Sequence, residues 1–329
     1  MRKSVFVVWS PFSRRSETLA ETLPAKIFLI KGNRKIFPLR FYRYLIQGWQ
    51  TFKILHQEKP EIIFVENPPI YAVLFVFLFA KFHHRKFIID SSTRPFIIEK
   101  WYHRLFLAWH HYFSRHALLT LLHNEELVQF VRSWKINWYV LEDGIPYFKS
   151  YCVQEKRKKM SVGVICSFSS DEPIEEILEA THKIPEVHFH LTGDKKKLNV
   201  KLKKKLSSNV TLTGFLPDEE YIKLLQSVEV IMVLTTRPHT LLCGAYEAVA
   251  VGKPLITSDL PLLRHHFYKG TVYVKNTAEA ISQGITKIFP SYHSLKRKMV
   301  ELNEEKERNW QEKIKELKKI ILQTREGPL

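Results

Sequence analysis

Short runs of β-branched and aromatic residues alternate along this chain with longer segments of helical spacing, and this alternation constrains the fold most. The run Ser4–Trp9 ends at a proline, and the run Ile62–Val65 ends at Glu66-Asn-Pro-Pro69. Helical spacing covers Phe41–Glu58 before the second run and Ile70–Phe82 after it. Strands that alternate with helices of this length indicate βαβ units on a parallel sheet.

The alternation is interrupted once, at the charge run Glu155-Lys-Arg-Lys-Lys159, and starts again with the strand Ser161–Cys166. A charge run of this kind is typical of a linker. The 329 residues also exceed one typical core and fit two domains of roughly 150 residues each. We therefore expect two Rossmann-like, doubly wound parallel-sheet domains over residues 1–150 and 151–290. The charged segment 291–329, with a helix over Leu295–Leu322, is expected to pack back toward the first domain.

The charge and the aromatic residues are concentrated in the first half. The net charge is +18, and residues 1–148 hold 21 Lys and Arg against 11 Asp and Glu. The same stretch holds 30 of the 42 aromatic residues. A basic, aromatic-rich half indicates an anionic partner with an apolar boundary, and a membrane surface satisfies both conditions. The alternative is a basic, solvated surface over an aromatic core.

Targeting and cysteine patterns favour a cytoplasmic protein. The apolar run after Met1-Arg-Lys is too short for a signal peptide, and the longest apolar run, Pro68–Ala80, is too short to span a bilayer as a helix. Three cysteines form neither a disulfide framework nor a metal-ligand spacing, so a reducing compartment is expected. Seven lysines lie between Lys195 and Lys205, and such a run is typical of a solvated helix face.

The segment Leu234–Ser258 carries the chemistry that the sequence shows most clearly. Gly244 allows close backbone approach at the start of a predicted helix, whose N–H groups and positive dipole end suit a diphosphate. Glu247 can accept two hydrogen bonds from a ribose diol, and the guanidinium of Arg237 matches phosphate geometry. In each case a structural role is the alternative: a helix-terminal charge for Glu247 and a surface ion pair for Arg237.

This segment resembles the donor-site signature of glycosyltransferase family 4. Glu247-Ala-Val-Ala-Val-Gly-Lys-Pro254 matches the second half of the signature, and Thr192-Gly-Asp194, Asn209–Asp218 and Gly144-Ile-Pro146 follow the family order. The resemblance implies the GT-B fold, in which two Rossmann-like domains face a central cleft. It implies a nucleotide-sugar substrate, UDP- or GDP-linked, with no separate cofactor and no metal, since the chain has no Asp-x-Asp motif. The implied donor-binding residues are Arg237, Thr240, Gly244, Ala245, Tyr246 and Glu247, and for Tyr246 packing is the favoured alternative.

Two departures from the family pattern bear on the site. His239 stands where the family has its first acidic residue, so we assign the catalytic role of that position to His239, with a loop histidine that contacts no ligand as the alternative. The loop Ser167–Pro173 lacks the Arg and Lys that the family places after the first strand of its second domain. Basic groups from the first domain, Arg14, Arg15 and Arg94, are therefore expected to contact the phosphates or the acceptor.

The resemblance places Asp90 and the segment Glu66–Pro69 at acceptor-cleft loops. Asp90 is the candidate general base, because it ends a predicted strand where it could face the cleft, and Glu66 is a second candidate. For both carboxylates a capping role is the alternative. We expect a glycosyltransferase that moves a hexose to a lipid-linked or polysaccharide acceptor at the cytoplasmic face of the membrane. The alternatives are a catalytically silent GT-B subunit that activates a partner, a GT-B enzyme such as a nucleotide-sugar epimerase, and a basic nucleic-acid-binding protein. No motif for specific nucleic-acid recognition supports the last of these.

Overall fold

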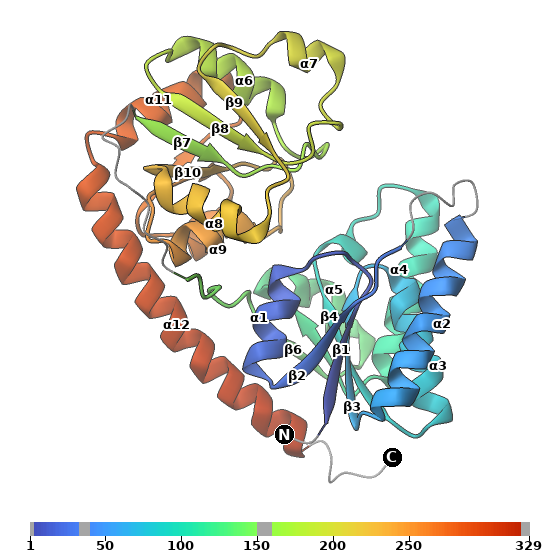
Figure 1. The fold of residues 1–329 in the computed structure, drawn as a ribbon. Helices are drawn as coiled ribbons and strands as arrows, with labels where there is room; N and C mark the ends of the chain where they lie inside the picture. Colours follow the sequence, from blue (N-terminus) through green and yellow to red (C-terminus); the bar gives the residue numbers. More distant parts are fainter. Residues whose placement is uncertain (1–2, 33–39, 150–159, 324–329) are drawn as a thin grey trace. The chain divides into compact units, whose positions relative to one another are not determined.

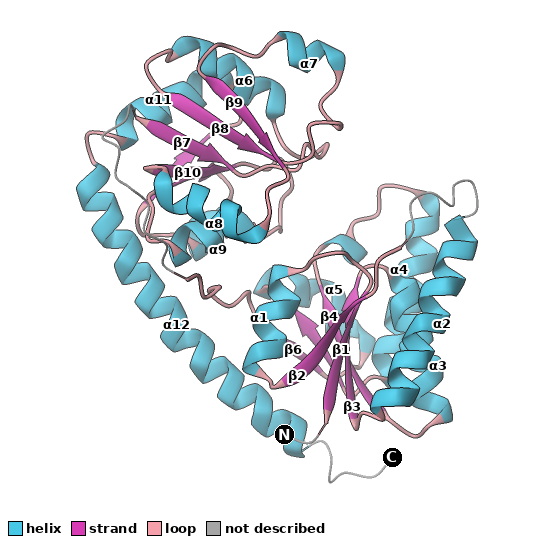
Figure 2. Ribbon diagram, viewed as in Figure 1, coloured by secondary structure: helices cyan, strands magenta, loops and turns pink. Residues whose placement is uncertain are grey.

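The computed structural model describes residues 3–32, 40–149 and 160–323. The chain forms two compact units: residues 1–144 together with 309–329, and residues 145–308. Each unit is a six-stranded parallel sheet with helices on both faces (Figures 1 and 2). The predicted linker Glu155–Lys159 lies outside the described residues.

The sheet of the N-terminal unit has the strand order β2-β1-β3-β4-β5-β6, with every described pair parallel. All five residues of the first strand are buried, which explains its uninterrupted apolar sequence. The strands are β1 (Ser4–Val8), β2 (Ala25–Leu29), β3 (Ile62–Asn67), β4 (Lys86–Ser91), β5 (Leu119–Leu122) and β6 (Trp138–Val140).

Helices cover this sheet on two faces (Figure 1). On one face the core joins Val5 and Ile63 of the sheet to Leu55, Phe79 and Phe113 of three helices. A smaller core lies beside β5 and β6, where Leu127 and Val131 pack with Phe96, Leu122 and Val140. The elements are α1 (Arg14–Thr22), α2 (Arg40–Glu58), α3 (Ile70–Phe82), α4 (Trp101–His116) and α5 (Val128–Val131), with the 3-10 helices η1 (Arg94–Phe96), η2 (Glu125–Leu127) and η3 (Arg132–Trp134).

The sheet of the C-terminal unit has the order β12-β11-β10-β7-β8-β9 and is also parallel. One face is covered by α6 and α11, and the other by α8, α9 and α10. The strands are β7 (Ser161–Val164), β8 (His188–Thr192), β9 (Val210–Gly214), β10 (Val230–Val233), β11 (Leu255–Ser258) and β12 (Thr271–Val274). The helices are α6 (Ile174–Lys183), α7 (Val200–Lys204), α8 (Asp218–Ser227), α9 (Cys243–Ala250), α10 (Pro261–His266) and α11 (Ala278–Ile288).

The last helix, α12 (Tyr292–Gln323), contributes to both units. Its first half places Met299 and Leu302 in a core cluster of the C-terminal unit. Its second half places Trp310 and Leu317 in the core of the N-terminal unit, against the face that carries α1. Most other residues of this helix are charged or polar, which explains why its sequence indicates an exposed helix although its apolar side chains are buried.

The predicted fold class, GT-B with two Rossmann-like parallel-sheet units, is confirmed. Strand β12 and helix α10 were missing from the prediction, because each is short and lies between Pro, Gly and basic residues that read as a loop. Among the described residues, no helix is both long and apolar enough to cross a membrane.

Candidate functional site

Both sheets have a point at which the strand order reverses, and ligands of open α/β sheets bind there, beyond the carboxyl ends of the strands. In the C-terminal unit the reversal lies between β7 and β10. The loops that leave these strands are residues 165–173 and 234–242. The predicted donor-binding segment begins in the second of them and continues into helix α9, so the topology and the sequence motif lead to the same place.

Helix α9 begins at this reversal and packs tightly against it. A side chain at Gly244 would meet Ile165, which follows β7, and Val233, which ends β10, each at 3.0 Å. The glycine therefore allows the first turn of the helix to approach the ends of both strands. The backbone N–H of Ala245 already donates to the carbonyl of Leu242 at 2.9 Å, so it is the N–H of Gly244 and the positive end of the helix dipole that suit an anion. These features fit the predicted role of Gly244, and they rest on the backbone rather than on side-chain chemistry.

The other predicted donor residues on α9 are buried. The ring of Tyr246 is 2% exposed and packs edge-on against Phe267 at 5.1 Å, so its side chain belongs to the core. Ala245 is also fully buried. Glu247 is 4% exposed and accepts a hydrogen bond from the hydroxyl of Tyr221 on α8. The sequence had not indicated Tyr221, which holds one oxygen of the proposed ribose-binding carboxylate.

Arg237 has a carboxylate beside it. Its guanidinium lies 3.4 Å from Asp171 of the loop after β7. That loop is fixed to the loop after β10 by three further bonds. The N–H and the hydroxyl of Thr236 donate to the Asp171 carbonyl at 2.7 and 3.1 Å, and the Thr235 hydroxyl donates to the Asp171 carboxylate at 3.3 Å. A phosphate that uses Arg237 must therefore compete with Asp171.

The residues next to Arg237 lie in the same loop. His239 adopts a left-handed backbone conformation, with φ of 58°. The hydroxyl of Thr240 donates to the carbonyl of Pro238 at 3.2 Å. The backbone N–H of Arg237 donates to the Thr235 hydroxyl at 3.1 Å. The loop is thus held by its own hydrogen bonds, and the described contacts of Thr240 serve the turn.

The loop after β7 also binds a carboxylate of its own. The backbone N–H groups of Ser167 and Ser169 donate to the carboxylate of Glu172 at 2.9–3.0 Å. Backbone N–H groups that converge on one carboxylate in this way form an anion-binding concavity. Here the anion is the protein's own side chain, in the loop where the family places a cationic pair.

One lysine of the run predicted to form a solvated helix face reaches this loop. Lys197 precedes α7, and its ammonium donates to the carbonyl of Ser167 at 3.1 Å. It lines a hollow of about 510 Å³ together with Glu172, Thr236 and Asn276. The ammonium of Lys197 thus lies beside the loop after β7, which itself has no Arg or Lys. It comes from the segment that follows β8. A lysine run carries no signal that distinguishes this member from its neighbours.

In the N-terminal unit, Arg15 and Asp90 form a buried ion pair. Asp90 is fully buried, and the guanidinium of Arg15 lies 2.8 Å from its carboxylate. Arg15 also donates to Asp143 at 2.7 Å and to the carbonyl of Leu141 at 2.8 Å. Burial alone would raise the pKa of Asp90, but the charges of Arg15 and His123 outweigh it and hold the pKa well below its usual range. A carboxylate this acidic is a poor proton acceptor, so the geometry favours a structural role for Asp90.

Glu66 and Arg14 lie near the start of α1. The hydroxyl of Ser16 donates to the carboxylate of Glu66 at 2.7 Å, and burial raises the pKa of Glu66 above its usual value. A raised pKa brings a carboxyl group closer to the range useful for proton transfer. Of the two predicted base candidates, the surroundings of Glu66 thus fit the role better. Arg14 lies 3.5 Å from Glu17 on the same helix.

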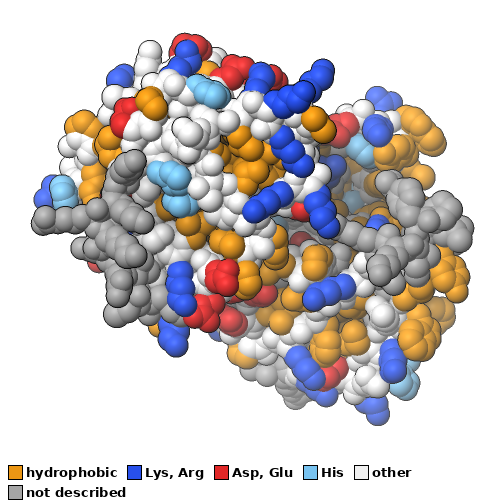
Figure 3. Space-filling view, turned by 45° about the horizontal axis from the view of Figure 1, so that its top comes forward, with side chains coloured by type: hydrophobic (Ala, Val, Ile, Leu, Met, Phe, Trp, Pro, Cys, Tyr) orange, Lys and Arg blue, Asp and Glu red, His pale blue; other side chains and the backbone are white. Residues whose placement is uncertain are grey.

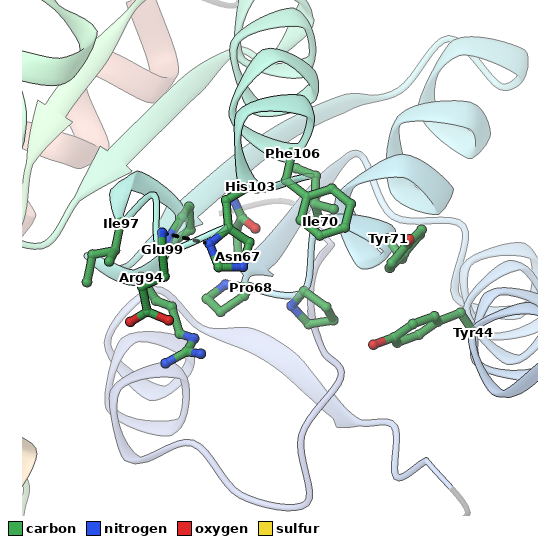
Figure 4. A pocket seen from close by; sticks show the side chains of 12 residues that line it. Tyr44, Asn67, Pro68, Ile70, Tyr71, Arg94, Ile97, Glu99, His103 and Phe106 are labelled. Atoms are coloured by element: carbon green, nitrogen blue, oxygen red, sulfur yellow. Dashed lines mark hydrogen bonds between the residues drawn. The ribbon is translucent and has the colours of Figure 1, made fainter. Parts of the chain in front are cut away.

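Arg94 belongs to a different place, a cavity at the carboxyl ends of β3 and β4. The cavity has a volume of about 300 Å³ and lies within the N-terminal unit (Figure 4). Asn67, Tyr71 and His103 line it together with Arg94. The structure therefore separates the predicted contacts of this unit into two groups, with Arg14, Arg15, Glu66 and Asp90 in one and Arg94 in the other. Within the described residues, no three His, Cys, Asp or Glu side chains lie close enough to hold a metal ion.

Comparison with solved structures gives close similarity of fold at low sequence identity. The sucrose-phosphate synthase of Thermosynechococcus elongatus is 14% identical, with a TM-score of 0.75 over 98% of this chain and 99% of that chain. Anabaena HepE in complex with UDP and glucose is 12% identical, with a TM-score of 0.73 over 98% and 100% of the two chains. The lipopolysaccharide outer core galactosyltransferase WaaB is 14% identical, with a TM-score of 0.58 over 98% and 99%.

A sequence comparison with curated proteins found no match. Residues 153–316, however, match the family of glycosyl transferases group 1. This range covers most of the C-terminal unit, including the strand reversal and α9. The chain thus has the GT-B fold, and its residues 153–316 are identified as a group 1 glycosyl transferase region.

Proposed function

We propose that the protein transfers a hexosyl group from a nucleoside-diphosphate sugar to a lipid-linked or polysaccharide acceptor at the cytoplasmic face of a membrane. The observation that carries the proposal is the placement of α9 at the β7/β10 strand reversal, with Gly244 in contact with both strand ends and Glu247 three residues on. The group 1 match over the same residues supports it. We place the chain in family 4 on the motif Glu247–Pro254.

In this reaction the departing nucleoside diphosphate gains negative charge as the glycosidic bond breaks. The N–H of Gly244 and the positive end of the α9 dipole are fixed beforehand, so they stabilise the developing charge without reorganising. Glu247, oriented by Tyr221, accepts hydrogen bonds from the ribose hydroxyls. Arg237 binds a phosphate oxygen after it exchanges Asp171 for the substrate. The charge of the diphosphate is met by these protein groups, and the proposal includes no metal ion.

A UDP-linked donor is favoured over a GDP-linked one, because HepE, a structure of the same fold, was solved with UDP and glucose. The acceptor class is supported from the other unit. Trp49 on α2 is 65% exposed and Trp101 on α4 is 82% exposed, and α4 carries Arg104 and Arg115 at exposed positions without any Asp or Glu. Exposed aromatic rings beside arginines suit an anionic lipid surface. Figure 3 shows Lys and Arg side chains lying among hydrophobic ones on the visible surface.

The test is a thermal-shift screen of the purified protein with UDP, GDP, ADP, TDP and their sugars. We expect one nucleotide to raise the melting temperature of the wild type, because a ligand that binds only the folded state stabilises it. The matched variant Glu247→Ala should lose this shift. Glu186→Ala, which removes an exposed carboxylate before β8 in the same unit, should keep it. If no nucleotide shifts the melting temperature of the wild type, the proposal fails.

A second function is favoured by one observation. Asp171 lies against Arg237, and Glu172 occupies the N–H groups of Ser167 and Ser169, so two groups suited to phosphate already face carboxylates. This arrangement also suits a silent GT-B subunit that activates a partner. A silent subunit would bind no nucleotide sugar even after both carboxylates are neutralised in Asp171→Asn/Glu172→Gln, whereas the enzyme should bind it in the wild type.

A further inference from the structure

The cavity at the carboxyl ends of β3 and β4 belongs to the N-terminal unit and lies apart from the donor motif. Its volume of about 300 Å³ lies at the lower end of the range for small-molecule sites, which corresponds to one ring rather than to a whole nucleotide. It is built by the segment 67–71, the segment 94–99 and the first turns of α4, with Tyr44 of α2 at one side. Three separate stretches of chain thus converge on it (Figure 4).

One side of the cavity is aromatic. The ring of Tyr71 stacks on that of Tyr44 with centroids 4.4 Å apart, and it meets the ring of Phe106 edge-on at 5.9 Å. These contacts hold the rings in fixed orientations, because each packs against another. The C–H face of a pyranose ring packs against an aromatic surface of this kind, and a tyrosine also offers a hydroxyl at its edge.

A buried amide on the cavity lacks a partner. Asn67 is 1% exposed, and its Nδ2 forms no hydrogen bond with any described residue. Buried polar groups are nearly always hydrogen-bonded, so an exception needs a reason such as a bound molecule that the protein chain does not supply. The backbone carbonyl of the same residue is satisfied, by the backbone N–H of Ser92 at 3.1 Å. The missing hydrogen bond is therefore that of the side-chain amide, not of the backbone carbonyl.

The remaining polar groups of the cavity are two hydrogen-bond donors, His103 and Arg94, and one acceptor, the carboxylate of Glu99. The backbone N–H of Glu99 donates to Nδ1 of His103 at 3.1 Å, a bond drawn in Figure 4. A neutral His103 therefore carries its proton on Nε2 and is a donor there. The carboxylate of Glu99 and the guanidinium of Arg94 both line the cavity, so its formal charges cancel. A phosphate would be repelled by Glu99, whereas neighbouring hydroxyl groups need donors and acceptors together.

We propose that this cavity binds one uncharged pyranose ring of the acceptor. The pyranose ring packs on Tyr71. Asn67 and His103 donate hydrogen bonds to its hydroxyl groups, and Glu99 accepts hydrogen bonds from them. The proposal rests on the proposed function and deepens it, since it names the part of the acceptor that the N-terminal unit recognises. It makes the acceptor a saccharide at this point, whether that saccharide is carried on a lipid or belongs to a polysaccharide.

The test uses simple glycosides and one conservative variant. Binding of the methyl glycosides of glucose, galactose, mannose and N-acetylglucosamine to the full chain is measured by saturation-transfer NMR. Asn67→Leu keeps the size of the side chain and removes the amide, and Asn137→Leu is the control because the Asn137 amide bonds at the protein surface. We expect at least one glycoside to bind the wild type and the control, and to bind Asn67→Leu at least tenfold more weakly.

The melting temperature separates loss of the site from loss of the fold. Because Asn67→Leu removes an unsatisfied buried donor, it should melt at the same temperature as the wild type or a few degrees higher. A variant that is equally or more stable but no longer binds identifies Asn67 as a ligand-binding group. No glycoside binding in the wild type, equal binding in Asn67→Leu, or displacement of the glycoside by inorganic phosphate would each overturn the proposal.

A nucleotide thermal shift on the same samples separates this inference from the proposed function. If UDP or GDP stabilises the wild type and Asn67→Leu alike while no glycoside binds, the cavity proposal is wrong and the transferase proposal stands. If no nucleotide binds but a glycoside does, and Asn67→Leu loses it, the cavity binds sugar and the transferase proposal is wrong.

Discussion

Arg15 uses its whole guanidinium to hold Asp90 and the loop that follows β6. The Nε and Nη2 atoms of Arg15 donate to the Asp90 carboxylate at 2.8–3.1 Å, and the remaining bonds go to Asp143 and to the carbonyls of Leu141 and Glu142. The pair joins the start of α1 to the end of β4. Because its donors are occupied and it is 7% exposed, Arg15 has little capacity left for a phosphate.

Replacement of Arg15 by methionine is expected to destabilise the protein by about 3–5 kcal/mol, because it leaves the charge of Asp90 buried without its partner. Urea unfolding at neutral pH measures this loss. Arg264→Met is the control: its pair with Asp259 is half exposed, and an exposed ion pair contributes little. An Arg15→Met variant that is as stable as the wild type but binds no nucleotide would show that the arginine serves the donor instead.

Neutralising Asp171 should strengthen nucleotide binding. The carboxylate of Asp171 lies 3.4 Å from Arg237, so Asp171→Asn removes a competing anion while it keeps the side-chain size. We expect UDP to bind about five- to tenfold more tightly, roughly 1 kcal/mol, and calorimetry at two salt concentrations measures the change. Glu186→Gln removes the same charge from an exposed position before β8 and serves as the control. An equal gain in both variants would mean that only the overall field changed, and that Asp171 does not compete for Arg237.

His110 should make the protein less stable as the pH falls below about 6.5. It is fully buried between Phe96 and Trp134, each 5.2 Å from its ring, and neither ring nitrogen bonds to a described residue. Burial, with a smaller contribution from His111, lowers the pKa of His110 to about 3. The folded state therefore binds the proton less readily than the unfolded state. The stability that the neutral ring contributes is present above the unfolded pKa of about 6.5, and it is lost as the pH falls toward 3.

The loss amounts to about 1.4 kcal/mol for each pH unit inside that window. His110→Leu should remove this part of the pH dependence, so the difference between wild type and variant should change by about 2 kcal/mol between pH 6.5 and pH 5 in urea unfolding. His293→Leu, at an exposed position of α12, should follow the wild type. If His110→Leu also follows it, the ring is not buried in the neutral form.

The part of the fold that the sequence could predict differs from segment to segment. The strands were predictable where both faces are buried, as in Ser4–Val8, because such strands are continuous apolar runs. The donor motif was predictable because Gly244 and Glu247 stand at fixed spacing in one short segment. Strand β12 was not, since a four-residue strand beside basic residues has no distinct period.

The partners of the site residues could not be predicted, because they come from distant segments. Asp171 meets Arg237 only after β7 and β10 pair in the sheet. Tyr221 reaches Glu247 from a neighbouring helix, and Lys197 reaches the loop after β7 from beyond β8. The sequence predicts Asn67 only as part of the segment Glu66–Pro69, which ends a strand. Its unsatisfied amide became visible only with the packing around it.

The exposed tryptophans of α2 and α4 should govern binding to anionic membranes. Trp49 and Trp101 are 65% and 82% exposed, and Lys53 lies 5.5 Å above the ring of Trp49. Rings of this kind insert at the headgroup level, and neighbouring cations add attraction to anionic lipid. Trp49→Ser/Trp101→Ser should therefore lower binding to vesicles with 30% phosphatidylserine by about tenfold, roughly 1.4 kcal/mol, in co-sedimentation.

Phe215→Ser provides the control, since Phe215 is 80% exposed but lies in the C-terminal unit. It should leave vesicle binding unchanged if the surface of α2 and α4 makes the contact. Binding should also weaken as salt rises, because charges at the surface are screened. Equal binding to neutral and anionic vesicles would exclude the electrostatic part. An equal loss in Phe215→Ser would show that exposed aromatic residues act wherever they lie, and that these two helices form no specific membrane surface.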